Sequence, residues 1–95
     1  MSCLENRKSR VIYCRGFEEE KITMDIIYNL FSNFGDILKI IFIRKKKAAL
    51  IEYENINYAS YAREYMNNVK FFGSQLKVLI KKIINEIFFY FCFFM

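Results

Sequence analysis

Residues 44–53 constrain the fold of this chain most, because four consecutive cations stop abruptly at a short apolar run. The cations are Arg44 to Lys47, and the run Ala48 to Tyr53 has the length and composition of one β-strand. Side chains alternate along a strand, so one face would carry Ala48, Leu50 and Glu52 and the other face Ala49, Ile51 and Tyr53. The basic segment then reads as the tip of a hairpin, either a solvated turn or a site that attracts a polyanion.

Three further segments have strand patterns. Val11 to Cys14 is a compact β-prone run, Ile37 to Ile43 is β-branched and apolar, and Leu76 to Lys81 alternates apolar with basic residues. Phe71-Phe72-Gly73 precedes the last of these and is typical of a turn. We therefore expect four strands, with residues 37–53 forming a hairpin.

Two segments between these strands have the spacing of amphipathic helices. The first apolar stripe is Ile27, Leu30, Phe31 and Phe34, and the second is Ala59, Ala62, Met66 and Val69. Thr23 and Asn57 are the expected N-caps, with Asp25 in the first turn of the first helix, and Gly35 is its expected end.

This order predicts an α+β fold of the split β-α-β (ferredoxin-like) type, a sandwich with a four-stranded antiparallel sheet and two helices on one face. Right-handed crossovers place the first and third strands side by side in the middle of the sheet. Ninety-five residues are enough for one such domain and no second one.

The composition limits the kinds of partner and site that the chain is expected to have. The formal net charge of +5 favours acidic partners by long-range attraction. The chain has no histidine, and its cysteines, Cys3, Cys14 and Cys92, are odd in number and widely spaced, so we expect no disulfide framework, no metal and no cofactor. A reducing compartment fits this cysteine usage.

The chain resembles an RNA recognition motif over about residues 9–82. The family's first-strand hexapeptide matches Ile12-Tyr13-Cys14-Arg15-Gly16-Phe17, and its third-strand octapeptide matches residues 46–53. Leu30 to Ile37 is similar to the family's first-helix exit. Members usually carry two stacking aromatics on the third strand, where this chain has Ala48 and Leu50.

With these aliphatic replacements the third strand has the sequence pattern Lys-Lys-x-Ala-Leu-Ile-Glu. This pattern resembles the branch that contains polypyrimidine-tract-binding protein and heterogeneous nuclear ribonucleoprotein L. The opening Ser9-Arg10-Val11-Ile12 points the same way. The resemblance implies binding of pyrimidine-rich single strands with fewer stacking rings. It also implies a nuclear protein, with shuttling to the cytoplasm as an option. Members of that branch carry several such domains, so a fragment or a truncated gene model is one interpretation of this chain.

Strand alternation assigns a candidate RNA-binding face turned away from the helices. Apolar residues would support bases and lysines would follow phosphates, while Glu52 would repel phosphate unless it accepts from a cytosine amino group. The candidate residues are Tyr13, Arg15, Lys39, Ile41, Ile43, Lys46, Lys47, Ala48, Leu50, Glu52, Lys77, Leu79 and Lys81.

Two functions fit this face: binding of single-stranded RNA in messenger RNA processing or regulation, or docking of a peptide or helix on its aliphatic residues. The partners would be RNA, other RNA-binding domains or a protein peptide. An enzyme is not expected, because the sequence has no histidine, no paired carboxylates in a motif and no phosphate-binding glycine loop.

The two ends lie outside the expected domain of residues 9–82. Residues 1–8 have the composition of a flexible polar arm, without a signal peptide. Residues 83–95 form a hydrophobic tail that is too short to span a bilayer, which needs about 20 residues. The tail is read-through past an exon boundary, a partner-binding or membrane-binding segment, or a cover for the aliphatic sheet face. We expect a chain ending at Lys82 to stay folded, to be more soluble and to bind RNA at least as well.

Overall fold

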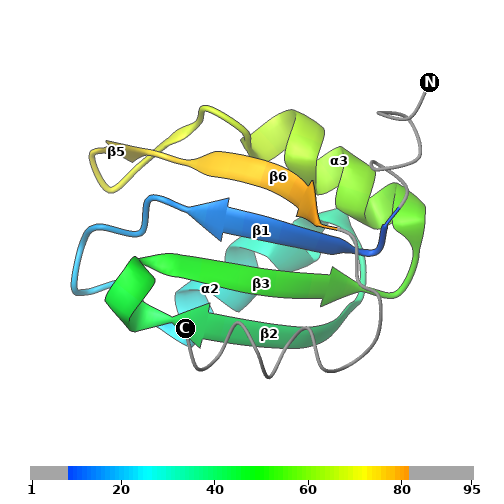
Figure 1. The fold of residues 1–95 in the computed structure, drawn as a ribbon, viewed down its shortest axis with the longest axis horizontal. Coiled ribbons are helices and arrows are strands. Elements are labelled where there is room, and N and C mark those ends of the chain that lie inside the picture. The colour runs from blue at the N-terminus through cyan, green and yellow to red at the C-terminus, as the bar shows by residue number, and fades with distance from the viewer. Residues whose placement is uncertain (1–8, 82–95) are drawn as a thin grey trace.

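The computed structural model describes residues 9–81 as a sheet with two helices on one face (Figure 1). The strands are β1 (Val11–Arg15), β2 (Ile37–Ile43), β3 (Ala48–Tyr53) and β6 (Lys77–Lys81). They pair antiparallel in the order β2-β3-β1-β6, and the helices are α2 (Met24–Phe31) and α3 (Ile56–Met66). The split β-α-β sandwich expected from the sequence is confirmed, with the first and third strands in the middle.

The strand register places Tyr13 at the centre of the sheet. Its Cα partner is Leu50 on β3 and Leu79 on β6. Across the β2–β3 hairpin, Ile41 pairs with Leu50 in turn. One row of side chains therefore crosses all four strands, in the order Ile41, Leu50, Tyr13 and Leu79.

The main core lies between the sheet and the helices. Ile12, Cys14 and Ile51 from the strands pack with Ile27 and Phe31 from α2, and all five side chains are fully buried. Tyr53 is also fully buried, and its hydroxyl donates a 2.7 Å hydrogen bond to the carbonyl oxygen of Phe31. That bond satisfies a polar group that would be costly to bury unpaired.

The first helix begins where the sequence predicts and ends earlier. The Thr23 hydroxyl accepts from the Ile26 amide at 3.3 Å, as an N-cap does. The α-helix stops at Phe31, and a 3-10 turn (Ser32–Phe34) carries the chain to Gly35. Gly35 has φ +149°, and a Cβ there would lie 2.1 Å from the Tyr58 ring. The glycine therefore allows α3 to pack against this turn.

The cap predicted for the second helix is wrong by two residues. The Asn55 carboxamide oxygen, not that of Asn57, accepts from the Tyr58 amide at 3.1 Å, and α3 begins at Ile56. Asparagine stands at both positions in the sequence, and a local pattern does not separate them. The helix ends at Met66, so Val69 lies beyond it, although Val69 still packs against the core.

The segment before the last strand forms a small hairpin that the sequence analysis placed only as a turn. Strands β4 (Lys70–Phe71) and β5 (Ser74–Gln75) pair around Phe72 and Gly73, both of which have positive φ. This is the backbone that a tight two-residue hairpin turn requires. The last strand then begins at Lys77, one residue later than expected.

Candidate nucleic-acid interface

The sheet face turned away from the helices carries its own apolar cluster. Val11, Leu50 and Ile43 form this cluster, with Tyr13 and Ile41 packed at its edge. It is separate from the main core, which contains the neighbouring strand residues Ile12, Cys14, Ile40, Phe42 and Ile51. The alternation predicted for β1, β2 and β3 is therefore present. We call this surface the open face and the cluster the face cluster.

Tyr13 is the aromatic ring on the central strand of the open face. Its side chain is half-buried between the strands of Leu50 and Leu79. The Lys81 ammonium lies 5.6 Å from the ring centroid, within the range of a cation–π contact. A base stacked on this ring would therefore have a cation beside it.

The other apolar residues of the open face differ in accessibility. Leu79 on the outer strand is 45% exposed, and Ile41 is partly exposed. Ala48 and Leu50, which hold the positions of the family's missing rings, have no exposed surface, and Ile43 keeps 8%. In this structure a base can touch Leu79 and Ile41 directly, whereas Ala48 and Leu50 lie beneath the accessible surface.

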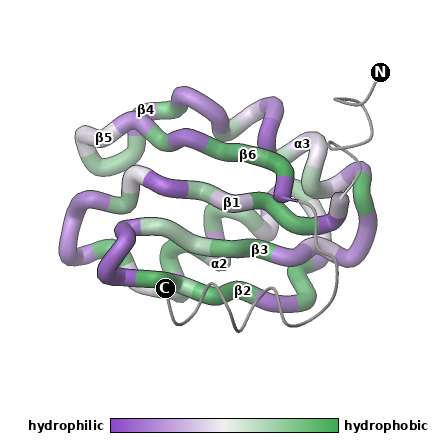
Figure 2. The backbone as a smooth tube through the Cα atoms, in the orientation of Figure 1, coloured by the Kyte–Doolittle hydropathy of each residue, from purple (hydrophilic) through white to green (hydrophobic). Residues whose placement is uncertain are grey.

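The basic segment forms the turn between β2 and β3, seen as the hydrophilic end of that hairpin in Figure 2. The match of residues 46–53 to the third-strand octapeptide predicts Lys46 on the third strand, and this is wrong. A 3-10 turn spans Arg44–Lys46 and contains Lys46. Lys45 and Lys46 are exposed there. Both lie at the end of the open face, Lys46 two positions and Lys45 three positions before Ala48, where β3 begins.

The four cations of this turn have different surroundings. Arg44 donates to the carbonyl oxygens of Glu20 (3.4 Å) and Ile22 (3.1 Å), and its guanidinium lies 4.7 Å from the Phe42 ring centroid. It therefore anchors the acidic loop to the helix side of the sheet. Lys47 lies 3.0 Å from the Glu18 carboxylate and adopts a left-handed backbone with φ 55°. Lys45 and Lys46 are thus the turn's best placed cations for phosphate.

Three further cations border the open face near β6. Arg15 is exposed at the end of β1, opposite Lys77. Lys77 donates a 2.7 Å hydrogen bond to the Asn68 side-chain oxygen, and Lys81 lies over Tyr13. The hydrogen bond to a neutral amide leaves the charge of Lys77 uncompensated, so it still contributes to the positive field.

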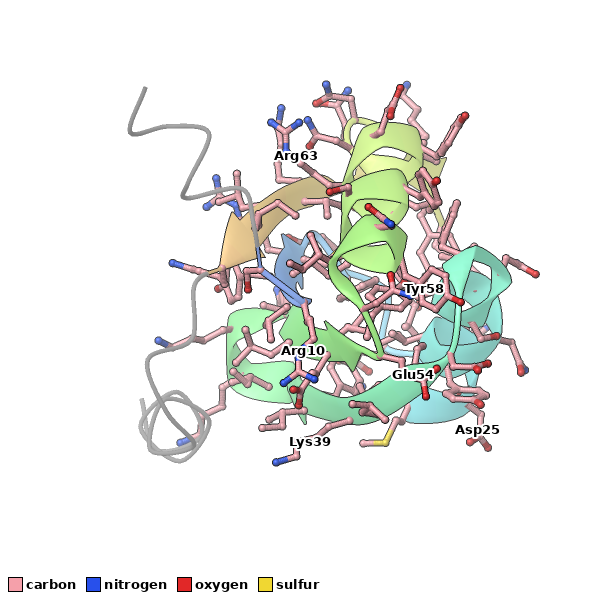
Figure 3. The ribbon with its side chains drawn as sticks, turned by 90° about the vertical axis from the view of Figure 1, so that its right-hand side faces the viewer. Arg10, Asp25, Lys39, Glu54, Tyr58 and Arg63 are labelled. Atoms are coloured by element: carbon pink, nitrogen blue, oxygen red, sulfur yellow. The ribbon has the colours of Figure 1, made fainter. Side chains whose placement is uncertain are left out.

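Glu52 on the open face is explained by an ion pair that the sequence analysis did not find. The Arg10 guanidinium lies 2.8 Å from its carboxylate, whose side chain is 13% exposed. Lys39 is the register partner of Glu52 on β2, and Figure 3 shows Arg10 and Lys39 at the same end of the sheet. The carboxylate is therefore neutralised by Arg10, and it repels phosphate less than its isolated charge would.

Sequence reasoning missed two residues of this surface, Arg10 and Val11. Val11 follows from the alternation that selects Tyr13, because the two residues are two positions apart. Lys45 lies within the cationic run that the sequence already indicates as a possible polyanion site. No sequence signal identifies Arg10, because its contact with Glu52 depends on the β1–β3 register, which pairs Val11 with Glu52.

Burial affects the two titratable groups of the main core. Burial raises the pKa of the Cys14 thiol from 9.0 to about 12, and it also raises the pKa of the Tyr53 hydroxyl, with a smaller contribution from Cys14. Both groups stay neutral at physiological pH and serve as packing. Between residues 9 and 81 there is no cluster of histidine, cysteine and carboxylate side chains that could hold a metal ion. No helix in the same range is long and apolar enough to span a bilayer.

Fold and surface together define a small α+β domain whose open sheet face combines one central aromatic ring with bordering cations. The family model of the RNA recognition motif (also called RRM, RBD or RNP domain) matches residues 2–92, and the chain belongs to this family. Human heterogeneous nuclear ribonucleoprotein L (Homo sapiens) is 29% identical over 75 residues, which are 78% of this chain and 13% of that protein. The chain thus spans about one eighth of that relative's length.

Solved structures show the same fold. The third RRM of Pes4 is similar with a TM-score of 0.70 and 28% identity, covering 81% of this chain and 96% of that one. The RNA15 RRM with bound RNA (GU) gives a TM-score of 0.68 at 23% identity, covering 81% of this chain and 85% of that one. At that identity the second likeness supports the fold alone.

Proposed function

We propose that this domain binds single-stranded, pyrimidine-rich RNA on its open face and acts in messenger RNA processing or regulation. The observation that carries the proposal is Tyr13, a central-strand ring at the hexapeptide position with Lys81 5.6 Å from its centroid. Membership of the RRM family supports RNA as the ligand. The relation to heterogeneous nuclear ribonucleoprotein L supports a nuclear role. The pyrimidine preference rests on the resemblance of the third strand, Lys-Lys-x-Ala-Leu-Ile-Glu, to the polypyrimidine-tract-binding branch.

Binding would combine stacking with phosphate contacts. One base stacks on Tyr13, which is worth about 1–3 kcal/mol, and a neighbouring base lies against Leu79 or Ile41. Lys45, Lys46, Lys77 and Arg15 attract the phosphates at one end of the strands, and Lys39 lies at the other. One ring in place of three gives weak affinity, so an isolated domain would act together with other RNA-binding domains.

A second function is favoured by one specific observation, the aliphatic character of the open face. Leu79 is 45% exposed beside a cluster in which Val11 and Leu50 are fully buried. A peptide or helix from another protein could use the same apolar row. In that case the cations would steer an acidic partner rather than contact phosphates.

Direct titration separates these functions. The full chain is titrated with short oligo-pyrimidine and oligo-purine RNAs of equal length at several stated salt concentrations, with tyrosine fluorescence and amide chemical shifts as readouts. The proposal expects binding of the pyrimidine strand, shifts centred on Tyr13 and Leu79, and weaker binding as salt rises. Absence of binding by either strand at low salt would refute RNA binding and favour the protein-docking function. An unbiased RNA selection at the same salt then defines the motif.

A further inference from the structure

The face cluster is buried although the helices of the described residues lie on the opposite side of the sheet (Figures 1 and 3). Val11 keeps 1% of its surface exposed, and Ala48 and Leu50 keep none. An antiparallel sheet with one uncovered face leaves the central side chains of that face in contact with water. An apolar occupant of this face would account for that burial.

We propose that the occupant is the chain's own C-terminal segment, residues 83–95, which docks on the face cluster and covers the RNA-binding surface. The last described residue, Lys81, pairs with Val11, a member of the cluster. The chain therefore leaves the sheet beside the surface that the segment would cover. Because the segment starts beside this surface, it can dock there without a second molecule.

The segment has the length to reach across the cluster. Crossing from β6 over β1 and β3 to β2 takes three strand spacings, about 14 Å in total. Residues 83–95 would span about 20 Å as a helix, and more when extended. Leu50 and Ile43, on β3 and β2, are therefore within reach of the segment.

The composition of the segment matches the cluster. Residues 87–95 read Ile-Phe-Phe-Tyr-Phe-Cys-Phe-Phe-Met, with no charge. Large aromatic side chains bury 150–250 Å² each, so leaving several of them in water is strongly unfavourable. The aliphatic Ala48, Leu50 and Ile43 provide a flat apolar surface for them, and the absence of rings at Ala48 and Leu50 leaves room for rings from the segment.

Docking would make the segment a competitor of RNA, a consequence that rests on the proposed function. The docking itself does not rest on it. Leu50 becomes accessible to a base when the segment leaves, so RNA and the segment would bind the same surface in alternation. RNA affinity in the full chain would then be reduced by the fraction of molecules in which the face is covered.

The test uses the full chain with a nitroxide spin label on Cys92. Cys3→Ser leaves Cys92 and the buried Cys14 as the cysteines of the labelled chain. The proposal expects loss of amide peak intensity at Leu50, Ile41 and Tyr13, with intensity retained at Tyr61 and Tyr65 on α3. The matched variant Phe88→Glu/Phe91→Glu, carrying the same label, should restore the intensity on the open face.

A mixture of labelled chain and unlabelled ¹⁵N chain identifies the source of any broadening. Broadening of the unlabelled chain would mean that a second copy supplies the segment, and it would overturn docking within one chain. Retained intensity at Leu50 in the labelled chain would overturn the proposal outright. RNA titrations of the full chain and of its Phe88→Glu/Phe91→Glu variant test the consequence separately. Broadening without any RNA binding would leave docking intact and refute the proposed function instead.

Discussion

The Arg10 Nη2 atom lies 2.8 Å from the Glu52 Oε2 atom at the edge of the open face. The backbone supports this ion pair, because the Tyr53 amide donates a 2.7 Å hydrogen bond to the Arg10 carbonyl oxygen. Arg10 is thereby held next to β3, one residue before β1 begins. Glu52 is an anionic side chain on a surface proposed to bind RNA, and its charge is paired with that of Arg10.

Loss of this pair should weaken RNA binding. Arg10→Ala removes the guanidinium that lies 2.8 Å from the Glu52 carboxylate, and we expect a loss of about 0.5–1 kcal/mol in RNA binding, roughly two- to five-fold in Kd. Adding Glu52→Gln to the same chain should recover most of that loss. Arg63→Ala on α3 is the control, because it removes an equal charge from the helix side. Equal losses for Arg10→Ala and Arg63→Ala would show that only net charge matters.

The lysines of the β2–β3 turn should differ in their effect on salt dependence. Lys46→Ala should flatten the logarithmic salt slope by about 0.7, because an exposed lysine that contacts phosphate releases one counterion from a single strand. Lys47→Ala should change it less, since Glu18 lies 3.0 Å from its ammonium. Sequence preference should stay unchanged in both variants. A salt slope that survives Lys46→Ala/Lys47→Ala would show that the turn is only solvated.

Gly35→Ala should destabilise the fold strongly. A Cβ at this position would lie 2.1–2.2 Å from atoms of the Tyr58 ring, and the backbone has φ +149°. We expect a loss of about 2–4 kcal/mol in the free energy of unfolding, measured by urea denaturation. Gly73→Ala is the matched control, because it also has positive φ but has nothing within 4 Å of the added Cβ. It should cost about 1 kcal/mol. Similar losses in the two variants would remove the packing argument for Gly35.

Stability should fall as the pH rises above 9. Burial raises the pKa of Cys14 from 9.0 to about 12, so above pH 9 the unfolded chain loses this proton while the folded chain keeps it. The stabilisation is complete below pH 9 and is lost as the pH rises towards 12, by at most about 1.4 kcal/mol per unit. Cys14→Ala should flatten the decline between pH 9 and pH 10, where Cys14 contributes more than Tyr53, whose ordinary pKa is 10.0. Equal slopes in urea denaturation of the two proteins would contradict this assignment.

The sequence predicts the fold well because apolar periodicity is strong in most elements. The run Ile37–Ile43 matches β2 residue for residue, and Thr23 caps α2 as expected. The alternation that predicts β3 also places Leu50 on the open face and Ile51 in the main core. These features depend on local spacing, which a sequence displays directly.

Features that depend on register or on close packing were not predictable. The partner of Glu52 lies 42 positions away along the chain, and only the pairing of β1 with β3 brings Arg10 to it. Arg44 reads as one more surface cation, yet it reaches back to the Ile22 carbonyl oxygen. The burial of Leu50 is likewise invisible to alternation, which identifies a face without showing whether the face is covered. The expected boundary at Lys82 remains a prediction, because residues 82–95 lie outside those described.

Binding of RNA by Tyr13→Ala tests the central claim most directly. The variant and the control Tyr61→Ala, which removes a 49% exposed tyrosine from α3, are titrated with the same oligo-pyrimidine at one salt concentration after both are shown to be folded. The account predicts that Tyr13→Ala weakens binding by about 1–3 kcal/mol, while Tyr61→Ala leaves the dissociation constant unchanged. An unchanged dissociation constant in folded Tyr13→Ala would contradict stacking on the open face and favour protein docking there.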